Sequence, residues 1–204
     1  MWRIVSALLL VASGAAGQTI QSWDGSGNGL LRGNYSFRNV IWFVGNQRGD
    51  LQGALAIYGI INFDGNGNYT FTCRLMDSRA TAPQNCSATP IPGIYRVSAG
   101  GFARIESPLE DGAPLDGLVS NGILVASSTE LETNDVLIAA QVRSEAATAA
   151  TLNGRFWTGA FHTPSANVTD ARDSLFPLNF DGAGSAGAVE ATGYIGSNGT
   201  LVTQ

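Results

Sequence analysis

The chain has 204 residues, of which 44% are hydrophobic and only 13% charged, with 26 glycines and a net charge of −5. This length allows one or two domains, and low charge with abundant glycine favours short strands and tight turns over long charged helices. The basic residues form no cluster or stripe, so a nucleic-acid partner is not expected.

The N-terminus predicts a secretory signal peptide over residues 1–17. Arg3 supplies a positive charge, an apolar run extends from Ile4 to Ala12, and small residues lead to Gly17. Cleavage there would leave Gln18 as the first residue. No later run is long enough to span a bilayer as a helix. We therefore expect a secreted, periplasmic or cell-surface protein with no membrane partner after cleavage.

Residues 18–29 (QTIQSWDGSGNG) are rich in glycine and lack periodicity, which predicts a flexible lead-in. From residue 30 to 142, apolar and polar residues alternate in short runs that are separated by turn signals. The strands expected are Asn34–Val44, Leu55–Phe63, Tyr69–Leu75, Gly93–Ser98, Phe102–Glu106, Leu115–Val119, Ile123–Ser127 and Val136–Val142.

These strands predict an all-β fold for residues 30–142. Eight antiparallel strands fit either a small closed barrel or a sandwich. Because one hairpin follows another along the chain, an up-and-down barrel is favoured over the sandwich.

The only two cysteines are Cys73 and Cys86. In an exported chain such a pair is expected to form a disulfide, which here would pin a loop to its strand. The alternative is two free thiols. Two cysteines and one histidine at these spacings match no zinc pattern, so no metal site is expected.

A second, partial copy of the domain is predicted at residues 152–204, after a linker at 143–151. LRGNY at 31–35 is echoed by LNGRF at 152–156, and NFDGNG at 62–67 by NFDGAG at 179–184. GIY at 93–95 and GYI at 193–195 give a weaker third echo.

The second copy reaches Gln204 after roughly half the length of the first, and half a barrel would expose strand edges. A partner could complete it, or it could pair with the first domain, or the chain could be a piece of a longer product. The last reading is favoured.

The L-x-G-x-Y opening, the F-D-G-x-G turn, the G-x-Y-x-V strand and the GF hairpin resemble an uncharacterised exported repeat β-domain of the acidobacterial type. More loosely, the pattern is similar to lipocalin-like barrels, which open with G-x-W. Here the third position is Tyr35 or Phe156 instead of Trp. The resemblance implies a secreted β-domain and supplies no catalytic residues.

The repeated NFDG segment has two readings, a hairpin turn or a calcium loop. Asp64, Asn66 and Asn68 have ligand spacing, but an EF-hand requires Gly at Tyr69 and Glu at Leu75. The second copy also loses a carboxamide ligand, so the turn is favoured, because Asp-Gly and Asn-Gly tolerate positive φ. The expected turn residues are Asp64, Gly65, Gly67, Asp181, Gly182 and Gly184.

No catalytic residue and no cofactor are expected. His162 is the only histidine, and no G-x-S-x-G motif accompanies it. Acidic residues in expected loops give a weak case for glycoside hydrolysis; they are Glu106, Glu110, Asp111, Glu130 and Glu132.

Trp42 falls on the face of its strand opposite Ile41 and Phe43. It is read either as core or as a wall residue with a ligand or a partner domain against it.

The sequence thus predicts an exported, non-enzymatic β-domain protein with a structural or adhesive role at or outside the cell surface. Candidate partners are the cell surface, a carbohydrate or a second copy. The first alternative is a small-ligand-binding module, lipocalin-like or sugar-binding, with an unidentified ligand; the second is a glycosidase-type enzyme. Large residues expected inside the barrel favour a filled interior; they are Tyr35, Phe37, Phe63, Tyr69 and Phe71.

Overall fold

The computed structural model describes residues 23–106, 114–128, 130, 132–143, 147–162, 167, 170–187, 192–195 and 200–203. The expected signal peptide, residues 1–17, lies outside them. The elements are η1 (Asn28–Leu30), β1 (Arg32–Val44), β2 (Leu51–Asp64), β3 (Asn68–Asp77), β4 (Gln84–Asn85), β5 (Ile91–Val97), β6 (Phe102–Glu106), β7 (Pro114–Ser120), β8 (Ile123–Ser127), β9 (Thr133–Gln141), η2 (Ala149–Thr151), β10 (Asn153–His162), β11 (Arg172–Asp181), β12 (Thr192–Ile195) and β13 (Thr200–Thr203).

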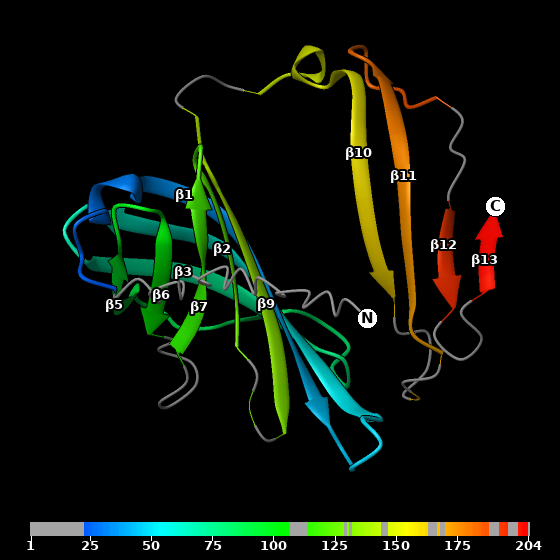
Figure 1. The fold of residues 1–204 in the computed structure, drawn as a ribbon, viewed down its shortest axis with the longest axis horizontal. Helices are drawn as coiled ribbons and strands as arrows, with labels where there is room; N and C mark the ends of the chain where they lie inside the picture. Colours follow the sequence, from blue (N-terminus) through cyan, green and yellow to red (C-terminus); the bar gives the residue numbers. More distant parts are fainter. Residues whose placement is uncertain are drawn as a thin grey trace, which may run out of the picture.

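Eight of these strands form a closed antiparallel barrel, which confirms the expected fold class (Figure 1). Each strand from β1 to β9, β4 excepted, pairs with the next one along the chain. β9 then pairs with β1, where Tyr35 lies opposite Gln141. Because the sheet closes, each of these eight strands has a partner strand on both sides. Of the two expected folds, the structure is therefore the barrel and not the sandwich.

The barrel interior is filled by side chains from alternate positions of its strands. An eight-stranded barrel is just wide enough for its side chains to fill it. Tyr35 meets Phe63 edge to face at 5.2 Å, and Phe63 meets Tyr95 at 5.0 Å. The largest fully buried side chains are Tyr35, Tyr95, Phe63, Leu31, Ile57, Ile105, Leu124 and Val97.

One end of the barrel is closed by the segment that precedes β1. Gly27 donates its N–H to the Val97 oxygen at 2.8 Å, and Asn28 Oδ1 accepts the Val97 N–H at 2.8 Å. Leu31, just after η1, is fully buried. Residues 24–29 are therefore tied to the barrel, which differs from the flexible lead-in that we expected over 18–29. Their partners lie about seventy residues away, beyond the reach of local sequence patterns.

The expected disulfide between Cys73 and Cys86 is confirmed. Cys73 lies on β3 against the barrel core, and Cys86 follows β4, the short strand that pairs with the end of β3. The Cys86 N–H also donates to the Cys73 oxygen at 3.1 Å. The loop between β3 and β5 is thus held to its strand.

The remaining strands form a separate four-stranded antiparallel sheet in the order β10-β11-β12-β13. In Figure 1 this sheet (yellow to red) stands beside the barrel. Phe161 of β10 meets Trp42 of β1 edge to face at 5.9 Å. Of the readings of Trp42, the structure therefore supports a wall residue with another part of the protein against it.

The hairpins β1–β2 and β10–β11 share their register. Gly33 lies opposite Phe63 in the first, and Gly154 lies opposite Phe180 in the second. The third sequence echo has no such counterpart. Gly93 lies on β5, which pairs with β3, whereas Gly193 lies on β12, which pairs with β11. No helix in the described part of the chain is long and apolar enough to cross a membrane.

Candidate ligand site at the barrel mouth

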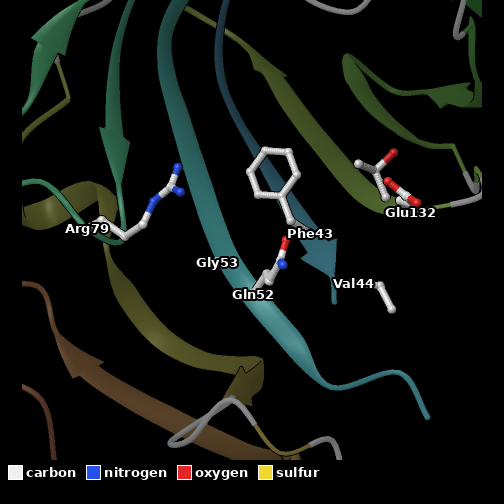
Figure 2. A pocket seen from close by; sticks show the side chains of 7 residues that line it. Phe43, Val44, Gln52, Gly53, Arg79 and Glu132 are labelled. Carbon is white, nitrogen blue, oxygen red and sulfur yellow. The ribbon is translucent and has the colours of Figure 1, made fainter. Parts of the chain in front are cut away.

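The end of the barrel opposite η1, here called the mouth, contains a cavity of about 220 Å³. In Figure 2, Arg79 and Glu132 lie on opposite sides of the Phe43 ring, above the start of β2. The lining residues are Phe43, Val44, Gln52, Gly53, Arg79, Glu132 and Thr133. They come from the end of β1, the start of β2, the segment after β3 and the start of β9.

One of the residues that line the mouth is a glycine. Gly53 lies directly opposite Phe43 across the β1–β2 pairing. A Cβ added there would lie 3.3 Å from Ser78 Oγ, 3.9 Å from the Phe43 ring and 4.0 Å from Arg79 Nε, so a side chain would take up part of the cavity. The rim is held by a hydrogen bond of 2.8 Å from the Val44 N–H to the Glu132 oxygen. Phe43 also lies opposite Thr133 on β9, so the cavity floor belongs to the inner wall of the barrel.

The charge of Arg79 is balanced locally by Asp77. The guanidinium donates from Nε to Oδ1 at 2.9 Å and from Nη2 to Oδ2 at 2.7 Å. These hydrogen bonds lower the pKa of Asp77 to about 2 and raise the pKa of Arg79. The Arg79 side chain is 74% exposed, so the pair contributes little to stability. It does remove the net positive charge from this side of the mouth.

Two polar residues beneath the mouth were missed at the sequence level, Asn39 on β1 and Asp135 on β9. Both are buried on the inner face. The sequence does indicate an inward position for Asn39, because it alternates along the strand with the same period as the apolar residues Phe37 and Ile41. Asp135 was missed because its charge broke the apolar alternation, so the strand was expected to begin at Val136.

The predicted turn residues make a self-contained hairpin turn. Asp64 Oδ1 accepts the N–H groups of Asn66 at 2.7 Å and Asn68 at 3.0 Å, and Oδ2 accepts Asn68 Nδ2 at 2.7 Å. The Asn68 side chain and these N–H groups hold the pKa of Asp64 below its usual range. Gly65 and Gly67 have φ values of 81° and 112°, which favour glycine.

The second turn repeats this geometry. Asp181 Oδ1 accepts the N–H groups of Ala183 at 2.7 Å and Ser185 at 3.0 Å. Gly182 and Gly184 again have positive φ, 72° and 105°. In both turns the carboxylate oxygens are directed at the turn's own donors. Among the described residues, no group of three or more His, Cys, Asp or Glu is placed to hold a metal ion.

The remaining candidate residues do not converge on one site. His162 is exposed at the end of β10, Glu106 is exposed on the outer wall, and Glu130 lies in the loop before β9. Only Glu132 of the acidic candidates lines the mouth cavity. Glu110 and Asp111 lie outside the described residues.

Comparisons of the chain with protein-family models, curated proteins and solved structures found no match. The geometry of this chain therefore carries the functional argument. A barrel with a filled interior and a small open mouth can bind only a small ligand inside, whereas its outer wall is available for larger partners.

Proposed function

We propose that this chain is an exported, non-enzymatic β-domain protein with a structural or adhesive role at or outside the cell surface, and that it self-associates through the outer wall of its barrel. The observation that carries the proposal is an uninterrupted apolar row on that wall. The row crosses four neighbouring strands, β6 to β9.

The members of this row, here called the outer apolar row, are direct cross-strand neighbours. Phe102 lies opposite Leu118, Leu118 opposite Val125, and Val125 opposite Ile138. Their exposed fractions are 45% for Phe102, 56% for Leu118, 47% for Val125 and 51% for Ile138. Single exposed apolar side chains are ordinary, but a contiguous set marks an interaction surface.

The outer apolar row is not needed to build the barrel core. The inner face of the same strands supplies buried residues such as Ala103, Leu115, Leu124 and Leu137. A strand with one buried face usually carries polar residues on the other. Apolar residues on both faces therefore indicate that the outer face is covered in the assembled protein.

A second copy of the chain fits this surface because the adjacent row is balanced in charge. Arg104 and Asp116 lie opposite each other, two residues along from Phe102 and Leu118. Their side chains form a bidentate salt bridge, in which Arg104 Nε and Nη2 each donate to an Asp116 carboxylate oxygen at 2.7 Å. In a two-fold interface the same patch meets itself. Because Arg104 is paired with Asp116 and also stacks on the Trp23 ring at 3.6 Å, this row presents no net charge that would repel the other copy. A strongly charged partner would gain nothing from the row itself.

Two further observations support export and a partial second copy. The Cys73–Cys86 disulfide is typical of an oxidising, extracytoplasmic environment. The hairpin β10–β11 has the register and turn hydrogen bonds of β1–β2, as expected if residues 152–204 copy the start of the barrel. N-terminal sequencing of the exported protein should begin at Gln18; retention of Arg3 would contradict the predicted cleavage.

The mass of the chain from residue 18 to 204, measured by analytical ultracentrifugation over a concentration series, tests self-association. We expect a monomer–dimer equilibrium that Leu118→Lys weakens by about tenfold or more, equivalent to 1.4 kcal/mol. Ile60→Lys is the matched control, because Ile60 is an outward residue of β2 with 39% exposure. A wild-type monomer at every concentration, or equal effects of the two lysines, would contradict the proposal.

A further inference from the structure

Two buried polar side chains lie next to each other inside the barrel, below the mouth. Asn39 is 6% exposed and Asp135 is 4% exposed. Across the β1–β9 pairing, Asn39 lies opposite Leu137 and Asp135 opposite Ile41, so the two polar residues are diagonal neighbours on the inner face. Asn39 Nδ2 donates to Asp135 Oδ2 at 3.4 Å.

This pair has more acceptors than donors. Within the described part of the chain, Asp135 Oδ1 accepts the Ser128 N–H, and Oδ2 accepts only the long bond from Asn39. Asn39 Oδ1 is buried and has no hydrogen-bond partner. Both donors to the carboxylate are neutral, and a buried carboxylate is normally compensated by a cation. A positively charged donor would therefore complement this pair.

The pair lies further inside the barrel than the mouth cavity, whose lining includes neither Asn39 nor Asp135. Phe43 and Thr133, which line the cavity, are opposite each other on β1 and β9, two residues from Ile41 and Asp135. The other end of the barrel is closed by η1, so a ligand would enter from the mouth.

The chemistry of the mouth favours a cation. The Glu132 carboxylate lines the cavity, whereas the charge of Arg79 is already balanced by Asp77. The ring of Phe43 offers an aromatic face to a cation or to an alkyl chain. The cavity volume, about 220 Å³, is below the range of drug-sized ligand pockets, which begin at about 300 Å³.

We propose that the barrel mouth binds a small primary amine whose ammonium group lies between the Asp135 carboxylate and Asn39 Oδ1. An ammonium has three N–H donors and no acceptor, so it complements a site that presents acceptors and a negative charge. The short alkyl part of the amine lies against Phe43. A ligand that presents a carboxylate would meet like charge, and an alcohol would supply one donor without charge. This site is inside the barrel and is independent of the outer apolar row.

Isothermal titration of the chain from residue 18 to 204 with three ligands of equal length tests the proposal: n-butylamine, n-butanol and butyrate. We expect saturable binding of butylamine, binding of butanol weaker by about tenfold or more, and no binding of butyrate. Asp135→Asn keeps an oxygen for the Ser128 N–H but removes the charge, so we expect it to weaken butylamine binding by a similar factor. Glu106→Gln, an outward residue of β6, removes one charge from the outer wall and should leave binding unchanged.

The ligand series decides the question even where Asp135→Asn does not fold, because it uses only the wild-type chain. Asn39→Leu, which removes the unpartnered acceptor, is a second variant and should also weaken butylamine. Three results would overturn the proposal: equal binding of butylamine and butanol, butylamine binding by Asp135→Asn that is as strong as that of the wild type, or no butylamine binding at all. The last result would mean that water fills the polar site.

Discussion

The hydroxyl group of Tyr95 donates a hydrogen bond of 3.0 Å to the main-chain oxygen of Leu31. It also lies 3.1 Å from the main-chain oxygen of Asn28. One buried side chain of β5 thus holds both ends of the η1 segment that closes the barrel. Burial raises the pKa of this hydroxyl, so it remains a donor at neutral pH.

Tyr95→Phe removes this donor and leaves a buried carbonyl without its partner. We expect the free energy of unfolding to fall by about 1–3 kcal/mol. Urea unfolding of the two chains measures the change. Tyr58→Phe is the control, because Tyr58 faces outward on β2, and it should have almost no effect. Equal stability of Tyr95→Phe and wild type would mean that η1 is held by its main-chain contacts alone.

The strands could be predicted because their signals are local. Phe102–Glu106 and Ile123–Ser127 were expected with the bounds that the structure gives, since alternation and a short turn define each hairpin. The closing pair β1–β9 joins residues about a hundred positions apart, and nothing local encodes it. The closing segment before β1 was read as flexible for the same reason, because its partner Val97 is on β5.

Most residues of the mouth site could not be predicted from the sequence. Its residues come from four separate segments, which only the closed barrel brings together. No sequence motif around Arg79 marks it as a site residue. Gly53 lies within a strand, where no turn signal draws attention to it. Asn39 carried a readable signal, a polar residue at an inward position, but its partner Asp135 could be identified only from the pairing of β1 with β9.

Gly93 on β5 should not tolerate a side chain. It lies opposite Tyr69 on β3, and an added Cβ would overlap the Tyr69 ring. The overlap would be with the hydroxyl end of the ring, and this end is fixed because the hydroxyl donates to the main-chain oxygen of Glu106. We therefore expect Gly93→Ala to lower the free energy of unfolding by about 1–3 kcal/mol in urea titrations.

Gly159→Ala is the matched control for this substitution. Gly159 also lies within a strand, β10, but a Cβ there would meet nothing within 4 Å. Its effect should be close to zero. If Gly93→Ala were as mild as Gly159→Ala, the Tyr69 ring would have to be free to move.

The disulfide should contribute to stability mainly by restricting the unfolded chain. Cys73 and Cys86 are 13 residues apart, and a loop of this size corresponds to about 3 kcal/mol. We expect the double variant Cys73→Ala, Cys86→Ala to lose an amount of this order in urea unfolding. Dithiothreitol should destabilise the wild type similarly and leave the double variant unchanged. An effect of the reductant on the double variant would assign the change to something other than this bond.

The ion pair at the mouth should appear in the pH dependence of stability. Arg79 lowers the pKa of Asp77 to about 2 in the folded chain, whereas an unfolded Asp has a pKa of about 3.9. Between these values the unfolded chain binds more protons. The contribution of Asp77 is therefore fully present above about pH 4 and is lost as the pH falls toward 2.

The melting temperature of the wild type and of Asp77→Asn, followed from pH 6 to pH 2, measures this contribution. Asp24, Asp64 and Asp181 also have lowered pKa values, so both chains should lose stability in acid. Because the pair is exposed, we expect the two curves to be separated only slightly above pH 4. They should converge toward pH 2, because only the wild type loses the Asp77–Arg79 pair. Arg79→Gln should behave as Asp77→Asn does in acid. A constant separation at all pH values would show that Asp77 stabilises the fold by contacts other than its charge.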